Sequence, residues 1–234
     1  GDDGSWDAVN YSAQCKKTIC EGKGYGEYNA GLTGLSLLAF LGAGYTHQSK
    51  ESYTDPITGK EMNFGRTVKE GLRWLIKNQD AEGCYGSRSA GKMMYNHTVG
   101  ALAMCEAFGL TSSPLFKEPA QKGIDFLIAA KNPYKAWRYT PKCGENDSSV
   151  TGWAVMALKS AEISGLSVSR SAMEEAKSFV DEITEKNYGK CGYQKVEDAG
   201  VKVVVQGKND DFTNHEALTA VCMVVRVFVD HDIK

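Results

Sequence analysis

Polar side chains with catalytic or metal-binding chemistry stand at the start of several apolar segments of this chain. His97 and His215 each follow an asparagine directly, and each leads into an apolar segment. Asp147 and Ser149 precede another apolar segment in the same way. Imidazole nitrogens and carboxylate oxygens bind zinc and also transfer protons in catalysis. His97, Asp147 and His215 are therefore the first residues to consider for chemistry, with Ser149 beside them.

These residues belong to a four-residue frame that recurs four times along the chain. The copies are Tyr28-Asn29-Ala30-Gly31, Tyr95-Asn96-His97-Thr98, Asn146-Asp147-Ser148-Ser149 and Thr213-Asn214-His215-Glu216. The second residue of each copy is a good helix N-cap, because its short polar side chain accepts from the unpaired amides of the first turn. The repeat predicts four helices and marks the N-terminal end of each.

Two kinds of helix alternate along the sequence. The segments at 30–43, 97–109, 148–164 and 215–229 are apolar nearly all round, which predicts that they are covered on most sides. The segments at 66–79, 117–131 and 171–186 are amphipathic, with one apolar face. The alternation predicts an all-α fold, an α/α toroid open as an arc, with inner and outer layers built from helical hairpins.

Two polar stretches interrupt the helical pattern. Residues 195–211 contain a valine-rich run and predict a short β-hairpin. Residues 45–64 carry turn signals at Asp55-Pro56 and Thr58-Gly59. We expect residues 1–234 to be one domain and a fragment of a longer chain, since Gly1 to Trp6 read like the middle of a loop.

Composition excludes several classes of protein. The net charge is −2 with no basic stripe, so no nucleic-acid partner is expected. No apolar run is long enough to span a bilayer. The seven cysteines include no Cys-x-x-Cys pair, which argues against a zinc ribbon. The sequence does not identify the compartment in which the protein works. Secretion or location in the periplasm is the expectation.

A glycine-and-aromatic signature lies in the loops between the hairpins. Its copies are Gly4-Ser5-Trp6, Gly83-Cys84-Tyr85-Gly86, Ala136-Trp137-Arg138-Tyr139 and Cys191-Gly192-Tyr193-Gln194. An aromatic ring in such a loop can fill the gap between successive hairpins. We interpret Tyr85 and Trp137 as structural in this sense. Tyr139, Tyr95 and Trp153 also supply aromatic surface near the mouth formed by the N-terminal ends of the apolar helices, and Tyr95 and Trp153 are left open as ligand-contacting residues.

The segment Gln79-Asp80-Ala81-Glu82-Gly83-Cys84-Tyr85 resembles the Gln-x-x-x-Gly-x-Trp element of squalene and oxidosqualene cyclases, with Tyr in place of Trp. Together with the helical repeats, the chain resembles the prenyltransferase/squalene-oxidase repeat superfamily, which includes terpenoid cyclases, protein prenyltransferase β-subunits and thioester domains. A closer resemblance is to bacterial proteins of unassigned activity that carry segments like LTGLSLLAFLGAG. The resemblance implies the toroid fold, while the activity depends on the site.

The resemblance implies a zinc site that this chain does not complete. Asp147-Ser148-Ser149 resembles the Asp-x-Cys element of protein prenyltransferases, and His215 resembles their histidine ligand. Ser149 stands where the family has a thiolate, and a hydroxyl is a poor zinc ligand. No cofactor is therefore expected, although Asp147 and His215 remain the zinc candidates. The acid motif of class II cyclases is also incomplete, because Lys208 replaces its first aspartate.

Thioester domains carry a Cys-Gly-Glu-Gln element, and Cys143-Gly144-Glu145-Asn146 stands in a similar place here. Asparagine is one methylene shorter than glutamine, so the same ring is not expected to close. A covalent-capture domain of the thioester type is the second alternative function.

Two main hypotheses of function follow. The first is a ligand-binding or interaction module that lacks the superfamily's catalytic motifs and takes an apolar small molecule, a glycan or a peptide. The alternative is an isoprenoid transferase or cyclase-type enzyme; whether the chain is an enzyme stays open, with binding favoured. Both use a cavity at the N-terminal ends of the inner helices, lined by His97, Asp147, Ser149, His215, Glu216, Tyr95 and Trp153.

Overall fold

The computed structural model describes residues 3–14, 22, 24–56, 59–198, 200 and 216–230. Most of this part of the chain is helical, which confirms the predicted all-α fold. Its α-helices are α1 (Asn29–Gly42), α2 (Phe64–Lys77), α3 (Met93–Thr111), α4 (Pro114–Ala130), α5 (Ser148–Ile163), α6 (Arg170–Glu182) and α7 (Glu216–Asp230). Two short 3₁₀ helices, η1 (Tyr11–Gln14) and η2 (Gly26–Tyr28), precede α1.

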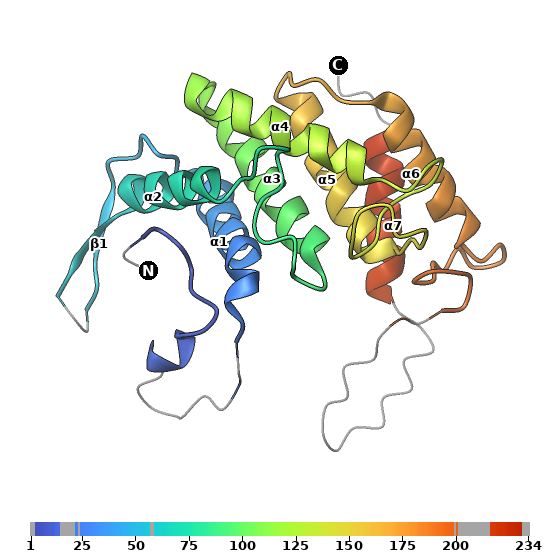
Figure 1. Ribbon diagram of the computed structural model, residues 1–234, viewed down its shortest axis with the longest axis horizontal. Helices are drawn as coiled ribbons and strands as arrows, with labels where there is room; N and C mark the ends of the chain where they lie inside the picture. The colour runs from blue at the N-terminus through green and yellow to red at the C-terminus, as the bar shows by residue number, and fades with distance from the viewer. Residues whose placement is uncertain are drawn as a thin grey trace.

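The helices form two layers that follow the chain in order (Figure 1). Helices α1, α3, α5 and α7 pack against one another in succession and make the inner row, with α1 and α7 at its two ends. Helix α2 packs on α1, α4 on α3 and α5, and α6 on α5 and α7. The connections from α3 to α4 and from α5 to α6 are short, so each of these pairs forms a helical hairpin.

Burial differs between the middle and the ends of the inner row. In α3 nearly every residue from Met93 to Cys105 is buried, and α5 is buried along most of its length, as predicted. The end helices are not covered on most sides: Leu35 of α1 and Met223 of α7 are 45% and 59% exposed. The reason is positional, because within the described residues each end helix has an inner neighbour on one side alone.

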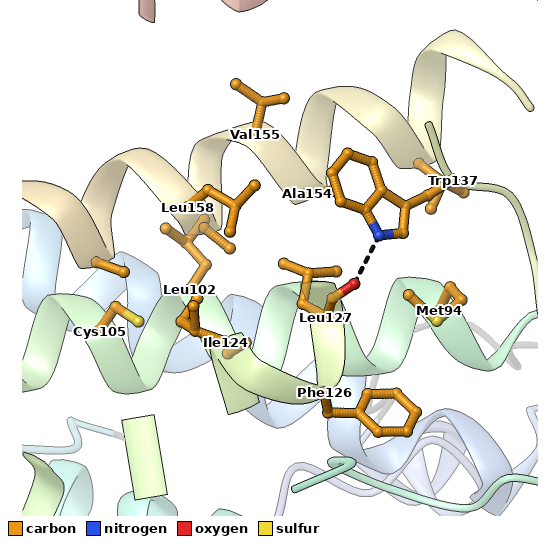
Figure 2. Packing of buried hydrophobic residues seen from close by; sticks show 14 of the residues in the cluster. Met94, Leu102, Cys105, Ile124, Phe126, Leu127, Trp137, Ala154, Val155 and Leu158 are labelled. Atoms are coloured by element: carbon orange, nitrogen blue, oxygen red, sulfur yellow. Dashed lines mark hydrogen bonds between the residues drawn. The ribbon is translucent and has the colours of Figure 1, made fainter. Parts of the chain in front are cut away.

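The core lies between α3, α4 and α5 (Figure 2). Leu102 of α3, Ile124 and Leu127 of α4, and Leu158 of α5 meet there, all buried. Trp137 fills the end of this core, and its indole Nε1 donates a 2.8 Å hydrogen bond to the carbonyl of Leu127. This bond gives the buried indole nitrogen a hydrogen-bond partner, which it would otherwise lack away from water.

Tyr85 has the same role one hairpin earlier. Its ring is buried, and its hydroxyl donates to the carbonyl of Pro119 at 2.7 Å. The interpretation of Tyr85 and Trp137 as plugs between hairpins is confirmed.

One hydrogen bond recurs at each of these loops. The backbone N–H of the plug residue donates to the side chain of the fourth or fifth residue of the following inner helix. The donor and acceptor pairs are Trp6 with Thr33, Tyr85 with His97, Trp137 with Thr151, and Cys191 with Thr219. The bond fixes how each loop is seated on its helix, and it places a histidine where the other repeats have threonine.

The predicted N-caps are right for one of the three helices that can be judged. Asp147 caps α5, its Oδ1 accepting from the amide of Val150 at 2.8 Å. Asn29 instead accepts from the amide of Ala8. Helix α3 begins three residues before Asn96, whose side chain accepts from the amide of Gly31 in the first turn of α1. Asn214 lies outside the described residues.

A two-stranded sheet lies in the polar insertion between α1 and α2. Strand β1 (Ser52–Thr54) pairs antiparallel with β2 (Glu61–Asn63), in the register Ser52 to Asn63. The sequence predicted turns in this insertion and did not predict the strands. The hairpin predicted at 195–211 falls mostly outside the described residues.

None of the helices in the described ranges combines the length and apolarity that crossing a membrane requires.

Candidate functional site

The candidate site is built around the N-terminal end of α5. Asp147 has an extended backbone conformation and caps the helix with Oδ1, which leaves Oδ2 directed toward the guanidinium of Arg138. Oδ2 and Arg138 Nε are 3.8 Å apart, which is longer than a hydrogen bond. The carboxyl group is fully buried. Arg138 also reaches outward, where it pairs with Glu145 at 2.6 Å.

Burial gives Asp147 an unusual protonation equilibrium. Removal from water raises the pKa of its carboxyl group to about 6, because the charged form loses its hydration. The amide of Val150, the nearby Tyr193 hydroxyl and the charge of Arg138 act in the opposite direction and offset part of this effect. Asp147 can therefore change its charge close to neutral pH.

Three tyrosines, Tyr95, Tyr139 and Tyr193, lie beside this carboxyl group, and we call them the tyrosine cluster. The hydroxyl oxygens of Tyr139 and Tyr193 are 2.5 Å apart. Tyr95 donates from its hydroxyl to Ser149 Oγ at 2.8 Å, and its ring centroid is 5.9 Å from that of Tyr139. Tyr193 is buried, whereas Tyr95 and Tyr139 are half-buried and keep part of their surface in solvent.

Two cations hold the ring of Tyr139. The guanidinium of Arg138 lies 4.9 Å from the ring centroid, and Lys92 Nζ lies 5.0 Å from it. A cation at this distance is attracted by the negative face of the ring. Both cations therefore help to fix an aromatic surface that solvent can still reach.

The hydroxyls of Tyr95 and Tyr193 stay protonated at neutral pH. Burial raises the pKa of Tyr95, and burial together with the contact to Tyr139 raises the pKa of Tyr193. A tyrosine in this state donates hydrogen bonds and cannot serve as a strong base. The cluster is therefore suited to recognising hydroxyl groups.

The structure brings three of the predicted site residues together: Tyr95, Asp147 and Ser149. Trp153 is half-buried and lies four residues after Ser149, so both share one face of α5. Glu216 is the exposed first residue of α7. His215 lies outside the described residues.

His97 is not part of this site, which corrects the sequence interpretation. Its ring is fully buried between α3 and α4, where Nδ1 accepts from the amide of Tyr85 at 3.2 Å and Nε2 lies 3.1 Å from the carbonyl of Gly123. Burial lowers its pKa to about 3, so the ring is neutral. His97 takes the place that threonine has in the other repeats and seats the Tyr85 loop.

Asn146 shapes the loop that carries Arg138 and Tyr139. Its Oδ1 accepts from Asn132 Nδ2 and from the amide of Ala136, both at 3.0 Å. Cys143 is an exposed free thiol in this loop, with its sulfur 3.5 Å from the carbonyl of Glu145. The Asn146 amide is thus already engaged in holding the loop.

No set of three or more histidine, cysteine, aspartate and glutamate side chains is arranged for metal binding within the part of the chain that the structure describes. His215, one of the two zinc candidates, is outside that part. The expectation that the protein binds no zinc therefore stays a prediction.

Comparisons with known proteins add information on the fold. No family model matches the chain, and no curated protein matches it. A solved structure named polysaccharide lyase BACCELL_00875 is similar, with a TM-score of 0.51 and 12% sequence identity over 99% of this chain and 82% of that one. At this identity the likeness shows the fold alone, and it leaves the resemblance to prenyltransferase repeats untested.

The sequence interpretation missed two residues of the site, Arg138 and Tyr193, and named Tyr139 only as part of the aromatic surface. All three belong to the glycine-and-aromatic loops, which the sequence assigned mainly to packing. The available signal was that two of these loops carry a second polar or aromatic residue beyond the plug: Arg138 and Tyr139 after Trp137, and Tyr193 after Cys191.

Proposed function

We propose that the protein binds a polysaccharide or oligosaccharide chain at the tyrosine cluster. The observation that carries this proposal is the convergence of Tyr95, Tyr139 and Tyr193 beside Asp147 and Arg138. Sugars present hydroxyl groups at their edges and C–H groups on their faces. Aromatic rings with fixed hydroxyl groups match both surfaces, and a few convergent polar groups orient the ligand.

The polar character of the cluster favours a glycan over an apolar small molecule. Each of the three rings ends in a hydroxyl, and Ser149 and Arg138 add further hydrogen-bonding groups. The tyrosine and serine hydroxyls already bond one another, but each keeps further capacity for hydrogen bonds, which a sugar hydroxyl can use and an isoprenoid cannot. The isoprenoid alternative therefore rests on the sequence resemblance alone.

The name of the similar solved structure supports the choice of ligand class. That protein is named as a polysaccharide lyase, so polysaccharides are what that name says it acts on. For this chain, the name directs the search for a ligand to polysaccharides first.

A panel of soluble polysaccharides tests the proposal by affinity gel electrophoresis. Neutral and acidic polymers are cast into native gels, and the wild type is compared with Tyr139→Ala. Tyr188→Ala is the matched control, because Tyr188 is 84% exposed in the loop after α6. We expect at least one polymer to retard the wild type and the control, with the retardation reduced in Tyr139→Ala. Equal retardation of all three proteins, or none with any polymer, contradicts the proposal.

Lyase activity on an acidic polysaccharide is a second candidate. In that reaction a base removes the proton next to a uronate carboxylate, the bond to the leaving oxygen breaks, and an acid protonates that oxygen. Asp147 has a pKa near the value of a useful base, and Tyr193 is a hydroxyl beside it that carries a proton for the leaving oxygen. We favour glycan binding over lyase activity, because Asp147 is fully buried and a catalytic base has to reach the substrate.

The two candidates are separated by incubating the protein with acidic polysaccharides and recording ultraviolet absorbance. A lyase creates a carbon–carbon double bond conjugated to the carboxylate, and absorbance rises with time. If it rises for the wild type and not for Asp147→Asn, the protein is an enzyme. Retardation in the gel without any rise in absorbance supports binding alone.

A further inference from the structure

A thiol occupies the last of the four plug positions. The first three are filled by the rings of Trp6, Tyr85 and Trp137, and the fourth residue is Cys191. Like the other plugs, Cys191 donates its backbone N–H to an inner helix, here to Thr219 Oγ1 at 3.1 Å. The side chain at this position is therefore held firmly against α7, although it offers no ring for packing.

Helix α7 presents polar groups to this sulfur. Thr219, Cys222 and Arg226 follow one another at intervals of three and four residues and so share one face of the helix. Arg226 donates from Nη1 to Cys191 Sγ at 3.7 Å, and Cys222 lies on this face between Thr219 and Arg226, the two residues of α7 that bond to Cys191. A neutral thiol is a weak acceptor, so this arrangement fits a thiolate at Cys191.

The neighbouring charges agree with that assignment. The pKa of Cys191 is lowered to about 6, first by the hydrogen bond from Cys222 and then by Thr184 and Arg226, which together outweigh burial. The pKa of Cys222 is raised, because its proton is held by Cys191. Asp181, a further charged group at this place, pairs with Arg226 Nε at 2.9 Å. One cysteine is thus prepared as a nucleophile and its neighbour remains a thiol.

The sulfur lies close to the surface of the protein. Cys191 is buried, but its Sγ is 3.9 Å from the carbonyl of Gly189, in the exposed loop that follows α6. That loop closes on itself through a hydrogen bond from the amide of Glu185 to the carbonyl of Lys190. This exposed segment is therefore the neighbour of the sulfur on the side away from α7 that a small reagent is expected to displace.

We propose that Cys191 and Cys222 form a thiol–disulfide exchange site whose substrate is a low-molecular-weight disulfide. The Cys191 thiolate attacks one sulfur of the small disulfide, the S–S bond breaks, and one small thiolate leaves. Cys222 then gives its proton to water and attacks the sulfur of Cys191, which expels the second small thiolate. The two protein thiols are oxidised by two electrons, and the small disulfide is reduced to two thiols. This proposal does not rest on glycan binding, although Cys191 lies two residues before Tyr193 of the tyrosine cluster.

Glutathione disulfide is the probe for the experiment. The full chain is reduced, freed of reductant, incubated with glutathione disulfide, quenched with acid and analysed by peptide mapping. We expect a crosslink between Cys191 and Cys222 in the wild type. In Cys222→Ser the second step is blocked, so a mixed disulfide with glutathione is expected to accumulate on Cys191. The exposed Cys143 is the internal reference for a thiol outside the site.

A pair of variants tests the role of the guanidinium. Arg226→Gln removes the charge next to Cys191, and we expect crosslink formation to slow about tenfold. Asp181→Asn is the matched control, because it breaks the ion pair on the same guanidinium and leaves the contact to sulfur. It is expected to react at the wild-type rate. Three results overturn the proposal: glutathione on Cys143 with Cys191 still reduced, no adduct on Cys191 in Cys222→Ser, or equal slowing in Arg226→Gln and Asp181→Asn.

Discussion

The hydroxyl oxygens of Tyr139 and Tyr193 lie 2.5 Å apart, although two helices, α5 and α6, separate these residues along the chain. Tyr139 comes from the loop before α5 and Tyr193 from the loop after α6. Their contact joins two successive hairpins at the N-terminal end of α5. The backbone reinforces it, because the amide of Ser148 donates to the carbonyl of Tyr193 at 2.8 Å. The candidate site is therefore a junction between repeats.

His97 is expected to make the protein sensitive to acid. An unfolded histidine has a pKa near 6.5, whereas burial holds the pKa of His97 at about 3 in the folded chain. The unfolded state then binds the proton first, so stability is lost as pH falls from 6.5 toward 3. The size of the effect is on the order of 5 kcal/mol. Urea unfolding across this range measures it.

His97→Thr is the matched variant, because threonine accepts the equivalent bond in the other repeats. At neutral pH we expect it to be less stable by roughly 2 to 4 kcal/mol, owing to the space left by the ring. Its stability should fall less steeply than that of the wild type below pH 6.5. Parallel pH profiles for the two proteins would show that His97 is not the buried neutral base.

Asp147 is expected to have the opposite dependence on pH. Its folded pKa of about 6 lies above the ordinary value of 3.8, so the folded state binds the proton more tightly. Its contribution to stability is present below pH 3.8 and is lost as pH rises through 6, by roughly 3 kcal/mol. Asp147→Asn keeps an oxygen for the cap and cannot ionise. The unfolding free energy of the variant, relative to that of the wild type, should therefore increase from pH 4 to pH 7. A constant difference would contradict the raised pKa of Asp147.

Zinc is not expected in the purified protein. Ser149 stands where a zinc ligand would be needed, and a hydroxyl binds zinc poorly. Elemental analysis after purification without added metal should find far less than one zinc per chain. One zinc per chain that disappears in His215→Ala would instead support a metalloenzyme of the transferase type.

Cys143 is expected to carry no thioester. The Asn146 side chain that would supply the carbonyl is held by Asn132 and Ala136. Intact mass after methylamine treatment should be unchanged. An added methylamine that maps to residue 146 would identify a covalent-capture domain in place of a binding module.

The fold was predictable because the apolar pattern reports burial directly. Helices at 148–164 and 30–43 were predicted within one residue of the observed α5 and α1. The caps were less predictable, since an asparagine has more than one possible partner. Asn96 lies in the first turns of α3 and caps its neighbour α1, and no local pattern distinguishes that contact from a cap on its own helix.

The site was predictable only in part. Asp147 was found because a cap is a local feature of the sequence. His97 was misplaced because its frame was aligned three residues late, which hid its equivalence to Thr33 and Thr151. Tyr139 and Tyr193 meet through tertiary packing alone, and residues so far apart in sequence give no periodic signal.

Calorimetric titration of the wild type, Tyr139→Ala and Tyr188→Ala tests the glycan-binding proposal most directly. The ligand is an oligosaccharide prepared from the polymer that retards the wild type most. We expect Tyr139→Ala to raise the Kd at least about tenfold, equivalent to about 1.4 kcal/mol, and Tyr188→Ala to leave it unchanged. Circular dichroism confirms that all three proteins are folded. An unchanged Kd in folded Tyr139→Ala would contradict glycan binding at the tyrosine cluster.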